Sequence, residues 1–75
     1  MYTLDKLEVG ESAFIDSLNI TGNFRRRLLD LGIIKGSEIT ALYKSPAKNP
    51  TAYFIKGTVI AIRDEYAKNI LLIKN

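Results

Sequence analysis

The chain contains no cysteine and no histidine. Without cysteine, neither a disulfide nor a thiolate site can form, and an intracellular location fits this composition. Any bound metal would depend on the eight carboxylates and on backbone oxygens, which suit magnesium or calcium better than iron or zinc. We therefore predict no metal site and no cofactor. Composition leaves open only a weakly held, carboxylate-bound divalent ion.

The sequence also lacks the patterns of a catalyst. The absence of histidine and cysteine excludes a nucleophile–histidine pair. Neither G-x-x-x-x-G-K-[ST] nor G-x-G-x-x-G occurs, so the usual phosphate-binding loops are missing. Composition leaves carboxylate-only or lysine chemistry open, but no cluster of residues points to it. We predict that the protein binds a partner and is not an enzyme.

Long apolar runs are missing as well. The longest uninterrupted ones, Val59–Ile62 and Ile70–Ile73, are far shorter than the ~20 residues of a membrane span. The stretch Met1–Asp5 has no basic region followed by an apolar one, so it does not read as a secretory signal. We expect a protein that is not inserted in a membrane and remains in the cytoplasm.

What the chain does have is the composition of one small globular domain, residues 1–75. Hydrophobic residues make up 47% and charged residues 25% of its 75 positions. The net charge of +3 permits attraction to an acidic partner. A nucleic-acid-binding small barrel is an alternative. Because Asp30, Glu38, Asp64 and Glu65 interrupt the positive surface, we expect no nucleic acid partner.

Short apolar stretches separated by turn residues predict a mostly β fold. The predicted strands are Ser12–Leu18, Ser37–Lys44, Thr51–Ile55, Thr58–Arg63 and Asn69–Ile73. Lys56 and Gly57 have the spacing of a two-residue hairpin turn, in which glycine is favoured at the second position. Thr3 is predicted to cap one early helical turn, and Asp64 to cap another at Asp64–Ala67.

One longer helix is predicted at about residues 23–31, after the first strand. Phe24, Leu28 and Leu31 recur at i, i+4 and i+7, which places them on one helical face and predicts that they pack on the core. Asn23 or Thr21 can cap its start. Gly32 suits a left-handed C-terminal cap of the Schellman type, with Ile33 folding back, and Gly36 suits the next turn.

Five strands and one helix favour a small, partly open barrel of the SH3-like type, in which the curved sheet protects its strand edges. The nearest rival is an OB barrel. That fold usually carries its helix between the third and fourth strands, where this chain has only Lys56 and Gly57. A small barrel with exposed strand edges can also self-associate weakly.

The most basic local run, Arg25–Arg27, lies near the predicted start of the helix. The helix dipole disfavours cations there. We therefore hypothesise that Arg25 or Arg26 contacts an acidic partner surface. Leu29 lies roughly 140° around the helix from Phe24, at 100° per residue, and so falls off the core face. It either packs beneath a loop or forms a mixed apolar–basic patch with Arg25.

A second candidate surface surrounds the one long loop, residues 45–50. It comprises Tyr43, Pro46, Pro50 and Tyr53. Aromatic-lined grooves hold extended peptides in SH3-like folds, so these residues can form a groove for a partner segment. The alternative is that the tyrosines cover the edge of the core.

The segment Arg26–Gly36 resembles the R-L-x-x-L-G-hydrophobic-x-x-G signature of the FeoA family of ferrous-iron-transport accessory proteins. The similarity continues through the early, loop and late positions Leu4, Leu7, Gly10, Ala13, Pro46, Pro50, Gly57, Ile60, Ala61, Ile62, Arg63, Ala67 and Ile70. Lys35 departs from the family, which often has proline there.

This resemblance implies an SH3-like barrel and a cytoplasmic accessory role in ferrous iron transport. The implied partner is FeoB, the membrane G-protein permease that imports ferrous iron. The barrel also resembles the C-terminal domain of iron-dependent repressors. A metal-responsive regulatory domain, with transition-metal binding as a family-level property, is therefore a further alternative.

Overall fold

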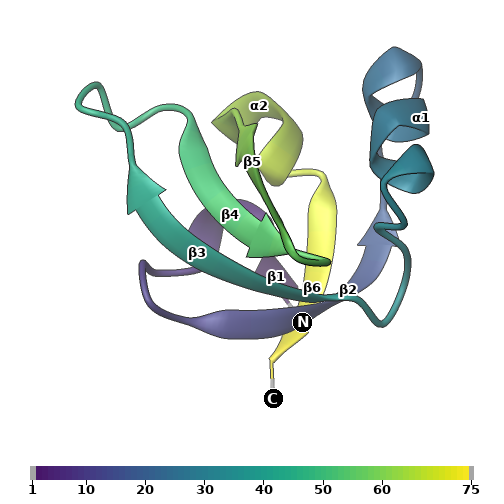
Figure 1. Cartoon of the computed structure of the whole chain (residues 1–75), viewed down its shortest axis with the longest axis horizontal. Helices are drawn as coiled ribbons and strands as arrows, with labels where there is room; N and C mark the ends of the chain where they lie inside the picture. The colour runs from purple at the N-terminus through teal and green to yellow at the C-terminus, as the bar shows by residue number, and fades with distance from the viewer. Residues whose placement is uncertain (1, 75) are drawn as a thin grey trace.

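The computed structural model describes residues 2–74, which form one antiparallel sheet, two α-helices and a 3₁₀ turn (Figure 1). In chain order the elements are β1 (Tyr2–Thr3), η1 (Leu4–Lys6), β2 (Ser12–Leu18), α1 (Asn23–Asp30), β3 (Glu38–Lys44), β4 (Thr51–Ile55), β5 (Thr58–Ile62), α2 (Asp64–Ala67) and β6 (Ile70–Lys74). The mostly β fold and the helix after the first long strand are confirmed.

The sheet has the strand order β1-β6-β2-β3-β4-β5. Strands β1 and β5 end this order and are not paired with each other within residues 2–74, so the curled sheet does not close (Figure 1). Register shifts between Ile15 and Ser17 and between Ala41 and Tyr43 interrupt the pairing of β2 and β3 with their neighbours. Such irregularities bend strands, which allows a short sheet to curl into the predicted partly open barrel.

The concave side of the sheet holds the apolar core. Its fully buried large side chains are Leu4, Ile15, Leu28, Ile33, Ile39, Tyr53, Ile55, Ile62, Ile70 and Leu72. The period of two explains this selection, because Ile39 and Ala41 of β3 face inward while Leu42 remains exposed. Burying each large aliphatic side chain contributes about 1.5–3 kcal/mol, so the nine Leu and Ile side chains among them dominate the stability of a small domain.

The predicted strands are correct to within one residue at each end, but one strand was missed. Strand β1 holds two residues, too few for alternation to be recognised. Ser37 precedes β3 because its hydroxyl closes the preceding turn, accepting from the Ile34 N–H at 3.1 Å. Arg63 lies outside β5 as the N-cap of α2, and β6 begins at Ile70, not at Asn69.

Helix α1 ends in the predicted Schellman motif. The Ile33 N–H donates to the Leu28 carbonyl and the Gly32 N–H to the Leu29 carbonyl, each at 2.9 Å. Gly32 has φ +82°, a left-handed conformation that strains any residue with a Cβ. Gly36, at φ +91°, makes the following turn as predicted. The chain therefore reverses at a fixed point and enters β3.

The prediction that Leu31 packs in the core is wrong. Its side chain is 40% exposed, because α1 ends at Asp30 and Leu31 already belongs to the cap. Ile33 folds back and takes the core position, with 2% exposure. Phe24 and Leu28 do face the core as predicted, Phe24 half-buried and Leu28 fully buried.

The predicted helix caps are wrong in their chemistry. Gly22 is the N-cap of α1, and neither Thr21 nor Asn23 makes a capping bond. Asp64 is the first residue of α2, and its N–H donates to the side-chain Oδ1 of Asn49 at 3.0 Å. Thr3 does occupy the N-cap of η1, but its hydroxyl donates to the Asp5 carboxylate and not to the backbone.

The two-residue turn between β4 and β5 is confirmed. Lys56 and Gly57 have φ values of +53° and +75°. Two successive positive φ values are the mark of a type I′ turn, whose twist matches that of the flanking strands. The turn fixes the register in which Ile55 lies opposite Thr58.

Candidate partner-binding site

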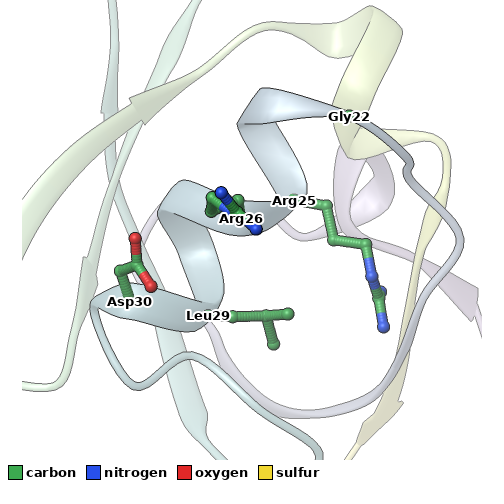
Figure 2. A pocket seen from close by; sticks show the side chains of 5 residues that line it. All are labelled: Gly22, Arg25, Arg26, Leu29 and Asp30. Carbon is green, nitrogen blue, oxygen red and sulfur yellow. The ribbon is translucent and has the colours of Figure 1, made fainter.

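An open pocket of about 300 Å³ lies against the exposed side of α1. It is lined by Gly22, Arg25, Arg26, Leu29 and Asp30, as Figure 2 shows. The structure thus brings together three of the residues that the sequence indicated as partner-binding, namely Arg25, Arg26 and Leu29.

The orientation of α1 is set by its buried side. Leu28 is 1% exposed, and Phe24 packs against the edge of the core. The ring of Phe24 also lies against the ring of Tyr66 in α2, with centroids 4.4 Å apart and planes inclined at 31°. These contacts hold one face of α1 against the barrel and leave the face that lines the pocket to solvent.

Arg25 connects the pocket to the end of β2. Its Nη1 donates to the Leu18 carbonyl at 3.0 Å, and its side chain is half-buried. In Figure 2 the side chains of Arg25 and Leu29 leave the helix on the same side, whereas Asp30 points away from them. Arg25 therefore forms a fixed wall of the pocket, with guanidinium N–H groups to spare for a ligand.

Arg26 is the unpaired cation of the pocket, because no hydrogen bond or ion pair within residues 2–74 holds its side chain. It is exposed, and it does not pair with Asp30, although the two lie four residues apart. Arg63, by contrast, pairs with Glu65 at 3.1 Å. A long, exposed cation with no partner is suited to contact an acidic group on another molecule.

The start of α1 adds to the positive character of the pocket. No acidic residue lies in the first turn, and the N-cap Gly22 has no side chain to accept a backbone N–H. The first N–H groups of a helix carry a partial positive charge, which an anion would stabilise. The arginines and the helix end therefore act in the same direction, and Asp30 supplies a negative charge at the far rim.

Leu29 supplies the apolar part of the pocket. Its side chain is 40% exposed, so it forms the mixed apolar–basic patch that was one of its two predicted roles. Gly22 and Asp30 were missed by the sequence-based hypothesis. The signal for both was available, because Gly22 directly precedes the helix and Asp30 follows Arg26 by one turn.

The second candidate surface does not form as predicted. Tyr43 is 60% exposed and Pro46 is exposed, but Pro50 is half-buried and Tyr53 is only 1% exposed. Tyr53 is therefore a core residue, and its predicted place in a groove is wrong. The reason is the period of two in β4, which turns Tyr53 inward with Ile55. Burial raises the pKa of the Tyr53 hydroxyl above its ordinary value of 10.0.

Polar groups of the loop of residues 45–50 form hydrogen bonds with one another. The Ser45 N–H donates to the Pro50 carbonyl at 3.1 Å and the Lys48 N–H to the Ser45 carbonyl at 2.7 Å. The Ser45 hydroxyl accepts from the Asn49 N–H at 3.1 Å, and the Asn49 side chain caps α2. The loop thus braces α2, and Tyr43 and Pro46 remain as separate exposed positions.

The carboxylates are dispersed. Over residues 2–74 no three Asp or Glu side chains come close enough together to hold a metal ion. The absence of a metal or cofactor requirement stays a prediction.

None of the helices between residues 2 and 74 is both long and apolar enough to cross a lipid bilayer.

Comparison with known proteins identifies relatives along nearly the whole chain. The sequence matches the FeoA domain family over residues 2–74. It is 33% identical over 67 residues to an Fe(2+) transport protein A/Fe(2+) transporter FeoB fusion protein of Porphyromonas gingivalis. That alignment covers 89% of this chain but only 8% of the fusion protein.

Solved structures show the same fold. The FeoA protein of Chlorobium tepidum is 28% identical, with a TM-score of 0.90 over 96% of this chain and 69% of that one. The zinc complex of Stenotrophomonas maltophilia FeoA, described as an SH3 domain protein, is 30% identical with a TM-score of 0.81. It covers 97% of this chain and 91% of that one, which confirms the predicted SH3-like fold.

A manganese-dependent transcriptional repressor also contains this barrel. The TM-score is 0.82 over 97% of this chain and 41% of the repressor, at 14% identity. At that identity the likeness shows the fold alone.

Proposed function

Because the chain belongs to the FeoA domain family, we propose that it is a cytoplasmic accessory protein of ferrous iron transport that docks on a FeoB-type permease. In this proposal the chain acts by binding and not by catalysis. Its docking site is the α1 pocket formed by Gly22, Arg25, Arg26, Leu29 and Asp30.

The fusion protein of Porphyromonas gingivalis supports the choice of partner. Its name joins Fe(2+) transport protein A and the transporter FeoB in one polypeptide. Tethering two modules raises their effective concentration, which is useful when the modules act on one another. A separate chain of the same family would have to achieve the same association through its own surface.

The observation that carries the proposed docking site is the pairing of exposed Leu29 with the unpaired cation Arg26 in one pocket. A partner segment with an acidic side chain next to an apolar one would fit both. The acidic group would reach Arg26 and the N–H groups of α1, while the apolar group would cover Leu29. Each interaction is stronger once the other has excluded water.

The test compares two adjacent arginines. Arg26→Glu reverses a charge in the pocket, whereas Arg27→Glu makes the same change on an exposed helical residue outside it. Binding of each variant to the purified cytoplasmic G-protein portion of FeoB from the same organism is measured by calorimetry. We expect Arg26→Glu to weaken binding by about tenfold or more, equivalent to ~1.4 kcal/mol, and Arg27→Glu to weaken it much less.

Circular dichroism confirms in parallel that both variants are folded. A folded Arg26→Glu variant that binds FeoB as tightly as the unaltered protein would rule out the α1 pocket as the docking site. Absence of binding by the unaltered protein would overturn the choice of partner itself.

A further inference from the structure

Strand β5 is an unusually bare sheet edge. It ends the strand order and pairs only with β4 within the described chain. Its sequence, Thr58–Ile62, contains no charged residue and no proline, and its pairing with β4 runs without a bulge. Charged residues, proline and bulges are the usual protection of an edge strand, because an open edge is a template for another strand.

The hairpin register identifies which backbone groups of β5 are free. Ile55 and Thr58 flank the two-residue turn and therefore exchange hydrogen bonds. By alternation, the backbone groups of Ile60 also face β4, and those of Val59 and Ala61 face away from the sheet. Outside the strand ladder, no backbone hydrogen bond within residues 2–74 involves either Val59 or Ala61.

The outer face beside this edge is apolar. Val59 is 53% exposed, and its cross-strand neighbour Phe54 is 45% exposed. In the next row Ala61 and Tyr43 are exposed, and Ala52, which pairs with both, is buried. An open backbone edge and an apolar surface thus occur together, which is the combination that strand addition requires.

We propose that β5 pairs antiparallel with β5 of a second copy of this chain, about a two-fold axis at Ile60. In this register Val59 of each copy lies opposite Ala61 of the other, and the two exchange both hydrogen bonds. All four free N–H and C=O pairs of the two edges are then used. The exposed apolar surface also becomes continuous across the interface, because Phe54 and Val59 of one copy lie in one row with Ala61 of the other.

Charge favours a second copy over another protein's peptide. Antiparallel pairing about Ile60 brings the turn that holds Lys56 of each copy near the start of α2, at Asp64, of the other. Both residues are exposed, and neither forms an ion pair between residues 2 and 74. Opposite charges brought near each other at an interface are favourable. The residues that flank β5 therefore carry charges that are complementary to the charges of the same residues in a second copy.

This interface is independent of the proposed FeoB site. No residue that lines the α1 pocket belongs to β5 or to its flanking turns. Docking on FeoB and pairing of β5 can therefore be tested separately on the same protein.

The first test removes one free donor. Ala61→Pro deletes an N–H that β4 does not use, whereas Ala61→Val keeps that N–H and suits a strand. Analytical ultracentrifugation over a range of concentrations should show the unaltered protein rising from its 8.4 kDa chain mass towards twice that value. Ala61→Val should behave similarly, and Ala61→Pro should stay at the single-chain mass. A constant single-chain mass for the unaltered protein overturns the proposal.

A charge swap keeps the proposal falsifiable if proline perturbs the strand. Lys56→Asp suits the positive φ of the turn, and both it and Asp64→Lys place like charges near each other at both ends of the interface. Each single reversal should raise the dimer dissociation constant about fivefold, and K56D/D64K together should restore it. The β5 register would be overturned if the single reversals had no effect, or if the double variant did not recover the original dissociation constant. Dimers that persist in Ala61→Pro would also overturn it.

Discussion

The two helices of this small barrel begin in opposite ways. Helix α2 starts with Asp64 and Glu65, its first N–H is capped by Asn49, and Arg63 pairs with Glu65 at 3.1 Å. Each of these features stabilises a helix start. Helix α1 has no acidic residue in its first turn and no capping side chain, and arginines follow directly.

This contrast shows that the start of α1 is less well stabilised than the start of α2. The four residues of α2 are too few to be helical without help, so its cap is needed. Helix α1 is held by the burial of Leu28 and by the Schellman end at Gly32. It therefore tolerates an unfavourable start, and Arg26 is available for a purpose other than folding, because no hydrogen bond or ion pair within residues 2–74 holds its side chain. We infer that this purpose is the docking of an acidic partner.

The largest effect is expected from the anchor of α1. Leu28→Ala should lower the free energy of unfolding by about 2–5 kcal/mol, because it removes a fully buried side chain and leaves a cavity. Leu31→Ala, three residues further on, should change it by no more than about 0.5 kcal/mol. Urea denaturation followed by circular dichroism measures both. Equal losses would mean that Leu31 shares the anchoring of α1.

The next effect concerns the cap of α2. Asn49→Ala removes the acceptor of the Asp64 N–H and should destabilise the protein by about 1 kcal/mol. Thr21→Ala, before α1, should be neutral because Thr21 makes no capping bond. Thermal melts of the two variants check this difference. A larger loss for Thr21→Ala than for Asn49→Ala would reverse the comparison of the two helices.

The smallest effect has the opposite sign. Arg26→Gln removes a cation near the start of α1 without placing a second carboxylate four residues before Asp30, and it should raise the free energy of unfolding by about 0.3 kcal/mol at low salt. Added salt should screen and so diminish the gain. Urea titrations at two salt concentrations are the measurement. A destabilised Arg26→Gln variant would show that Arg26 serves folding, which contradicts the role assigned to it.

Local sequence patterns were sufficient for the parts of the fold that local geometry determines. The hairpin at Lys56 and Gly57 and the Schellman end at Gly32 both follow from residues adjacent in sequence, and both are confirmed. The failures depend on distant contacts. Asn49 caps α2 from 15 residues away, and β1 exists only because it lies beside β6. Helical spacing alone could not show that Leu31 would yield its core position to Ile33.

The candidate site divides in the same way. Helical angles were enough to group Leu29 with Arg25, because both lie on one helix. The hydrogen bond from Arg25 to the Leu18 carbonyl fixes one wall of the pocket. It joins α1 to β2, so the spacing of residues along the sequence could not predict it. Tyr53 was placed in a groove by its proximity to the loop, whereas the pleat of β4 turns it into the core.

Nuclear magnetic resonance titration of the labelled protein with the cytoplasmic G-protein portion of FeoB tests the docking site most directly. We predict that the amide signals of Gly22, Arg25, Arg26, Leu29 and Asp30 shift or broaden first. Signals from the 45–50 loop and from Tyr43 should change little. Perturbations confined to that loop and Tyr43, with α1 unchanged, would contradict the account.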